Sequence, residues 1–146
     1  MNTTIIEALY TWFDASEVLN ENTPLQVDYL DPNEPAYSLQ IIPCTPTIRK
    51  YADGSEKRQY LFVFAMRAPY GESNAVNMRN LAFFERLERW IAEAERNDNL
   101  PVLPEGYTAQ NVTVLSSGYA MTNTQRTAHY QIQCRLSYIR EAGSLY

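Results

Sequence analysis

Residues that usually carry enzyme chemistry are scarce in this sequence. Its 146 residues include one histidine, His129, and two cysteines, Cys44 and Cys134. A general base at His129 would need an orienting carboxylate and a nearby nucleophile, and no serine or cysteine lies in a nucleophile-elbow context. Two cysteines far apart in sequence match no metal or redox pattern, so we predict buried thiols rather than a disulfide. We therefore expect no catalytic residue and no enzymatic activity.

Patterns that bind cofactors or metals are also missing. Gly71 and Gly118 belong to no glycine-rich phosphate loop. Asp28, Asp31 and Glu34 follow one another at intervals of three and could in principle hold a hard cation, but the central glycine and terminal glutamate of a calcium loop are absent. We interpret these carboxylates as a solvated acidic loop and predict neither a cofactor nor a metal site.

Long apolar runs and basic clusters are absent as well. The longest apolar run, 61–66, has the length of a buried strand and not the ~20 residues of a membrane helix. Residues 1–7 lack the basic region and apolar core of a signal peptide. The formal charge is −5, from 12 basic and 17 acidic residues, which argues against tight binding to nucleic acid. These features predict a protein made in the cytoplasm, with no membrane contact and no specific binding to DNA.

What the sequence does contain is the composition of one globular domain. Hydrophobic residues make up 45% and charged residues 20%, and 146 residues fit a single domain spanning 1–146. Eleven tyrosines suit partly wet protein interfaces, because each combines an apolar ring with a polar tip. Tyrosine is equally favoured in β-sheets, so this abundance alone does not decide between the two explanations.

Two segments have the periodicity of helices. Residues 2–16 place apolar side chains at intervals of three and four, and Thr3 or Thr4 can cap this helix. A longer helix is predicted from a cap at Ser73 or Asn74 to about Arg96. Its predicted buried stripe consists of Phe83, Phe84, Leu87, Trp90, Ile91 and Ala94.

The remaining segments indicate strands. Asp-Gly in the turn 52–55 predicts a hairpin between 47–51 and 56–67. Residues 61–66 are apolar on both faces, which predicts cover on both sides, from this chain or from a neighbouring subunit. Further strands are predicted at 25–30, 37–41, 111–121 and 126–140, with a turn at 122–125. The order of elements indicates an α+β fold with a mostly antiparallel sheet, and with the N-terminal helix and the long central helix packed on one face.

Three stretches of the chain resemble a known family. They are similar to the small tail and minor capsid proteins of siphophages of gram-positive bacteria, which are likened to lambda-type tail terminators. The resemblance covers about residues 5–138 and rests on a spread of aromatic and turn residues rather than on one motif. The stretches are Val27-Asp28-Tyr29-Leu30 with the strand 37–42 and the prolines of 43–46; Lys50-Tyr51-Ala52-Asp53-Gly54-Ser55 with 59–62; and Phe83-Phe84-Glu85, Trp90-Ile91, Leu100-Pro101, Gly118-Tyr119 and 128–133.

The resemblance implies a single tail-terminator-like domain that forms a hexameric ring. Such a ring caps the tail tube, stops its polymerisation and joins it to the head connector. Its partners would be other copies of this chain, the phage tail tube protein and a head-completion protein. DNA would pass through the lumen without specific binding, and the protein would reside at the head–tail junction of the virion after synthesis in the bacterial host cytoplasm.

Two groups of residues are candidates for an assembly interface, because no other role is evident for them. One is the charged hairpin and the other is the polar face of the last strand. The hairpin charges could instead discourage edge-to-edge pairing of sheets. The chain could also be another head–tail connector, a minor capsid protein or a tube subunit, and a small ligand-binding domain is a more distant alternative. The candidate residues are Lys50, Asp53, Gly54, Lys57, Arg58, His129, Gln131, Gln133 and Arg135.

Overall fold

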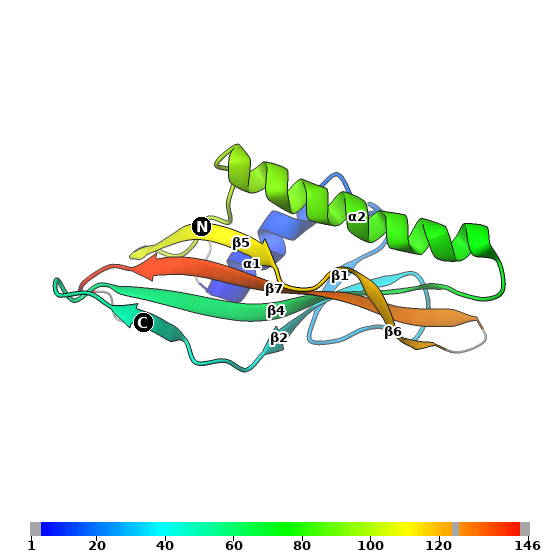
Figure 1. Ribbon diagram of the computed structural model, residues 1–146, viewed down its shortest axis with the longest axis horizontal. Coiled ribbons are helices and arrows are strands. Elements are labelled where there is room, and N and C mark those ends of the chain that lie inside the picture. Colours follow the sequence, from blue (N-terminus) through cyan, green and yellow to red (C-terminus); the bar gives the residue numbers. More distant parts are fainter. Residues whose placement is uncertain (1–3, 124–125, 144–146) are drawn as a thin grey trace.

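A computed structural model describes residues 4–123 and 126–143 and has an α+β architecture. The α+β class with two helices is as predicted, and the sheet in these residues has seven strands where six were predicted (Figure 1). The helices are α1 (Ile5–Asp14) and α2 (Asn74–Arg96). The strands are β1 (Leu25–Val27), β2 (Ala36–Ile42), β3 (Thr47–Lys50), β4 (Glu56–Pro69), β5 (Tyr107–Val114), β6 (Tyr119–Asn123) and β7 (Thr127–Arg140).

Two long strands form the centre of the sheet. Strands β4 and β7 pair antiparallel along their whole length, from Glu56 opposite Arg140 to Pro69 opposite Thr127. Strands β2 and β3 follow one another along the outer edge of β4, and β5 and β6 do the same along β7. Strand β1 pairs in parallel with β2, so the described sheet is mixed but mostly antiparallel.

Both helices begin where the sequence places a capping side chain. The Thr4 hydroxyl accepts a hydrogen bond from the Glu7 backbone N–H at 3.2 Å and donates one to the Glu7 carboxylate at 2.9 Å. Ser73 caps α2 by accepting from the Val76 N–H. These bonds satisfy N–H groups that the first turn leaves without a helical partner. The predicted start of α1 at residues 2–3 lies outside the described residues, and the helix ends two residues before the predicted Ser16.

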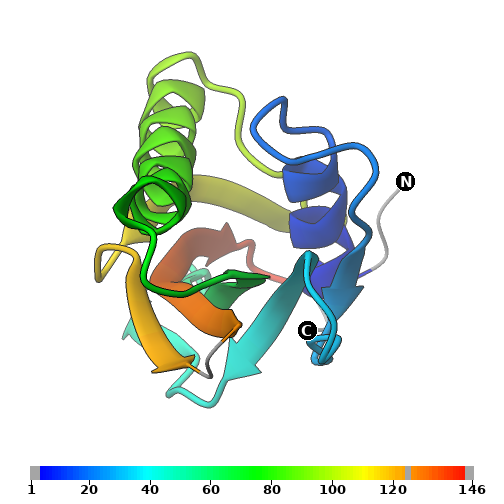
Figure 2. The ribbon, with the colours of Figure 1, turned by 90° about the vertical axis from the view of Figure 1, so that its right-hand side faces the viewer.

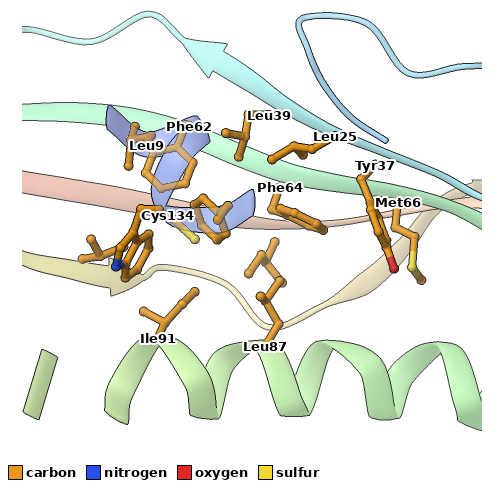
Figure 3. Packing of buried hydrophobic residues seen from close by; sticks show 14 of the residues in the cluster. Leu9, Leu25, Tyr37, Leu39, Phe62, Phe64, Met66, Leu87, Ile91 and Cys134 are labelled. Atoms are coloured by element: carbon orange, nitrogen blue, oxygen red, sulfur yellow. The ribbon is translucent and has the colours of Figure 1, made fainter. Parts of the chain in front are cut away.

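The main core lies between the helices and one face of the sheet. Alternate residues of β4 and β7 point toward α1 and α2, and Figure 3 shows Phe62, Phe64 and Cys134 among them. The ring of Phe13 from α1 lies 5.5 Å from that of Phe64, measured between centroids. Both cysteines are free, as predicted, with Cys134 buried and Cys44 half-buried. Burial raises the pKa of the Cys134 thiol to about 12, so this sulfur is a packing group.

The segment 111–121, predicted as one strand, is two strands. Strand β5 begins four residues earlier, at Tyr107, and ends at Val114, and β6 begins at Tyr119. The break brings Gly118 against α2, where a Cβ added to this glycine would lie 2.4 Å from Cβ of Phe84. The break therefore depends on a tertiary contact that periodicity does not reveal. The predicted turn at 122–125 is also shifted, because β6 continues to Asn123, while residues 124–125 lie outside the described residues.

The face of the sheet away from the helices is called the open face here. It carries the odd-numbered residues of β4 and β7 and the even-numbered residues of β2, as the pairing of Ser38 with Ala65 and of Ala65 with Gln131 shows. Viewed along the strands in Figure 2, β6 and β2 turn downward on either side of β7, away from the helices. The prediction that 61–66 is covered on both sides is confirmed by burial. Phe62 and Phe64 are buried on the helix side, and Val63 and Ala65 are buried on the open face, although no helix covers them there.

Candidate assembly interface

The hairpin between β3 and β4 forms as predicted, at the left end of the molecule in Figure 1. The Tyr51 N–H donates to the Ser55 carbonyl at 2.9 Å, and Gly54 has a φ of +93°, which favours glycine. Asp53 accepts from the Ser55 hydroxyl at 2.6 Å and from its N–H at 2.9 Å. These two bonds lower the pKa of the Asp53 carboxyl. The tip is thus an ordered turn held by its own polar groups.

The cations of the hairpin are divided between the two faces of the sheet. Lys57 pairs with Arg49 on the open face. Arg58 pairs with the core residue Tyr138, and Lys50 pairs with Glu56, so both lie on the helix side. Successive side chains on a strand point to opposite faces, and the structure accordingly does not bring Lys57 and Arg58 together. Arg49 belongs to the same group of hairpin cations in the sequence but was not among the predicted interface residues, and the structure places it directly opposite Lys57.

The base of the hairpin is fastened on the helix side. Glu56 accepts a hydrogen bond from the Thr47 hydroxyl at 2.8 Å and forms an ion pair with Arg140 at 3.1 Å. The Thr47 bond, helped by the Arg140 charge, lowers the pKa of Glu56. Because Arg140 belongs to β7, this ion pair fixes the base of the hairpin against the central strand pair.

The four candidates on β7 share the open face, as strict alternation predicts. His129, Gln133 and Arg135 are half-buried, whereas Gln131 is only 7% exposed. The expectation that this polar face is exposed is therefore wrong for Gln131 and holds only in part for the other three. Gln131 is buried because of its place in the middle of the sheet, where its side-chain amide donates to the Tyr119 hydroxyl of β6 at 3.3 Å.

Several polar atoms on the open face are buried without a hydrogen-bond partner among the described residues. They include Nε of Arg135, Nε2 of His129 and Oγ of Ser38. Burial, with the nearby charge of Arg67, lowers the pKa of His129, which favours a neutral imidazole. An unsatisfied buried polar group costs about 1–3 kcal/mol. These three atoms are already shielded within the subunit and are therefore not themselves accessible to a partner.

The described part of the chain contains no group of three or more His, Cys, Asp or Glu side chains that could hold a metal ion. The Asp31 carboxylate accepts from the Asn33 N–H at 2.8 Å and so shapes its own loop. The Asp28 carboxylate accepts from the Ile41 N–H at 3.0 Å and so links this segment to β2. No helix in residues 4–123 and 126–143 is long and apolar enough to cross a membrane.

A hollow of about 440 Å³ lies between α1 and the residues that follow α2. Trp12 and Trp90 line it, with ring centroids 4.5 Å apart, and the Trp12 indole N–H already donates to the Asn99 carbonyl at 2.7 Å. Glu17 is the one ionisable side chain among its described lining residues. A small-molecule site normally has several converging polar groups, and these lining residues do not supply them.

No protein-family model matches this chain, and no curated protein is significantly similar to it.

Proposed function

We propose that this protein is a non-enzymatic structural subunit that assembles into a ring and terminates the tail tube of a siphophage. The observation that carries the proposal is the open face, which neither helix covers and on which the cations Arg49 and Lys57 have no ion-pair partner among the described residues. A face that carries accessible charges of one sign is suited to contact with a partner of opposite charge. The resemblance drawn from the sequence supplies the phage assignment.

The fold provides what a ring subunit requires. Its helices cover one face of the sheet and its hairpin is held by Glu56 and Arg140, so the remaining open face is presented on a rigid support. A contact between two different surfaces of identical subunits closes into a ring when the rotation between neighbours allows it. In this proposal the ring stops at one layer, caps the tube and meets a head-completion protein on its other side.

Passage of DNA is compatible with the charge of the subunit. The formal charge of −5 gives a ring of several copies a strongly negative total. Tight binding to DNA needs several cations that displace counterions. The proposal therefore places DNA in the lumen without a specific contact.

The first test is the solution mass of the purified protein over a range of concentrations, measured by light scattering after gel filtration. A closed ring should give one discrete species of about 100 kDa, which is about six chains of 16.8 kDa. Growth without limit as concentration rises would contradict termination and favour a tube subunit. A species that stays at the mass of one chain would contradict ring formation.

The second test separates a terminator from other ring proteins of the virion. The purified ring is added to polymerising tail tube protein, and tube lengths are measured by electron microscopy. A terminator should bind one end of each tube and shorten the length distribution. Tubes of unchanged length with no ring at either end would contradict the proposed role even if the ring itself forms.

A further inference from the structure

Acidic residues are concentrated in the first part of the chain. The first 48 residues contain seven carboxylates and no lysine or arginine, and the first cation is Arg49. The carboxylates among them lie within residues 7–34, which belong to α1, β1 and the loops around them along one flank of the molecule, at the right in Figure 2. We call this surface the acidic flank. Its carboxylates are Glu7, Asp14, Glu17, Glu21, Asp28, Asp31 and Glu34.

The strands carry four of the chain's 12 cations on the open face: Arg49, Lys57, Arg67 and Arg135. Arg49 and Lys57 lie directly opposite each other there, and Arg135 follows on β7, two side-chain rows from Lys57. Two rows correspond to about 13 Å along a strand. The described strand residues on this face include no aspartate or glutamate, and Arg49, Lys57 and Arg135 form no ion pair with a described residue. We call these three residues the basic row.

The arrangement of the basic row is unfavourable within one chain. Like charges directly opposite each other on neighbouring strands destabilise a sheet, and Arg49 and Lys57 are such a pair. Arg135 is a third cation on this face without an ion-pair partner among the described residues. Carboxylates on another molecule would relieve the repulsion between these cations. On the acidic flank, Asp14 is exposed and has no ion-pair partner among the described residues.

Both surfaces also expose apolar side chains. Ile48 is 47% exposed and Tyr51 is 40% exposed, on either side of the basic Arg49. Val27, at the edge of the acidic flank, is 41% exposed. Val27 also lines a shallow hollow of about 240 Å³, together with Ile6, Glu7, Tyr10 and Thr11 of α1. Protein interfaces typically combine such an apolar centre with a charged rim.

We infer that the basic row and the hairpin of one copy dock on the acidic flank of a second copy of this chain. This inference rests on the proposed function and names the surfaces through which the ring would form. The two surfaces differ, so the contact is head-to-tail and repeats from copy to copy, as ring closure requires. Phosphate groups would also be attracted to the basic row, but the acidic flank and the net charge of −5 disfavour nucleic acid as the occupant.

Two charge-reversed variants test the inference. The first, Arg49→Glu with Lys57→Glu, keeps a like-charged pair at the same position in the hairpin. The second, Asp14→Lys with Glu17→Lys, adds cations at the end of α1, where the helix dipole favours positive charge. Each variant alone should bind itself about 100-fold more weakly than the wild type, because its two docking surfaces carry charge of the same sign.

Mixing the variants is the decisive step. The acidic hairpin of the first variant matches the basic flank of the second, and the unchanged surfaces also match, so the mixture should recover an assembly with the wild-type number of subunits. The mass of each sample is measured by light scattering after gel filtration, at about 0.05 M and about 0.5 M salt. The wild-type assembly should be weaker at the higher salt, because salt screens the attraction between opposite charges. The control variants are Arg89→Glu and Glu93→Lys on the exposed side of α2, which should leave assembly unchanged.

Four results would overturn the inference. Rings of wild-type mass from both variants would show that other surfaces carry the contact, while ring formation itself would stand. A wild type that is monomeric at all concentrations would remove both the inference and the ring. Variants that melt like the wild type but do not combine when mixed would exclude the pairing of these two surfaces. Retention of a DNA duplex by the wild type and its loss in the Arg49→Glu and Lys57→Glu variant would assign the basic row to nucleic acid.

Discussion

Replacing Gly118 by alanine should destabilise the protein through one specific contact. The added Cβ would lie 2.4 Å from Cβ of Phe84, a distance at which one of the two groups must move. Rotation of the Phe84 side chain cannot relieve the overlap, because its Cβ is fixed to the backbone of α2. Movement of the helix is also restricted, since Phe84 is only 1% exposed and packs against Phe64 and Tyr130. Overpacking of this kind costs about 1–3 kcal/mol.

The assay is urea and thermal unfolding followed by circular dichroism. For a domain of this size, about 1–3 kcal/mol corresponds to a fall in Tm of about 3–12 °C. Ser117→Ala is the matched control, because it also places alanine in this loop but at an exposed position, and it should change stability by less than about 0.5 kcal/mol. If Gly118→Ala unfolds at the same urea concentration as Ser117→Ala, the close approach of this loop to α2 is wrong.

The other predictions concern ionisable side chains. Because burial raises the pKa of Cys134 to about 12, only about one molecule in ten thousand carries its thiolate at pH 8. A thiol reagent should therefore modify one cysteine, Cys44, in the folded protein and both cysteines in denaturant. Rapid modification of both cysteines in the folded protein would contradict the burial of Cys134. Burial lowers the folded pKa of His129 below its unfolded value of about 6.5. The unfolded state then takes up the proton first, so stability should fall as the pH drops through about 6.5. The measurement is the urea midpoint at about pH 7.5 and at about pH 5.5. The difference between the two midpoints should be smaller in His129→Gln than in the wild type, and an equal difference would refute the role of His129.

Local signals in the sequence predicted much of the fold. Ser73 caps α2 and the Asp53-Gly54 turn closes a hairpin, because both features depend on residues within a few positions of one another. Strict alternation along 126–140 placed every candidate on β7 on the correct face. The buried stripe of α2 followed from its period for the same reason.

Features that depend on distant parts of the chain were not predicted. The parallel pairing of β1 with β2 leaves no local mark in the sequence. Asn80, on the buried face of α2, reads as an ordinary surface residue, yet its side-chain amide donates to the Pro69 carbonyl at 2.7 Å where β4 ends. The burial of Gln131 likewise comes from strands on both sides of it. Of the candidate interface, the sequence therefore predicted which residues share the β7 face but not how accessible each one is.

The pairing of β4 with β7 also determines when the sheet can form during folding. Even the nearest paired residues of these two strands, Pro69 and Thr127, are separated by the 57 residues of 70–126. Closing a flexible loop of that length costs about 3.5 kcal/mol of chain entropy plus a constant, before the contacts between the strands repay it. The hairpin and α2 involve local contacts and can form early, whereas the centre of the sheet must wait for the last described strand. We therefore expect this protein to fold slowly for its size, and a ribosome-bound chain that has not yet released β7 to expose the unpaired edge of β4.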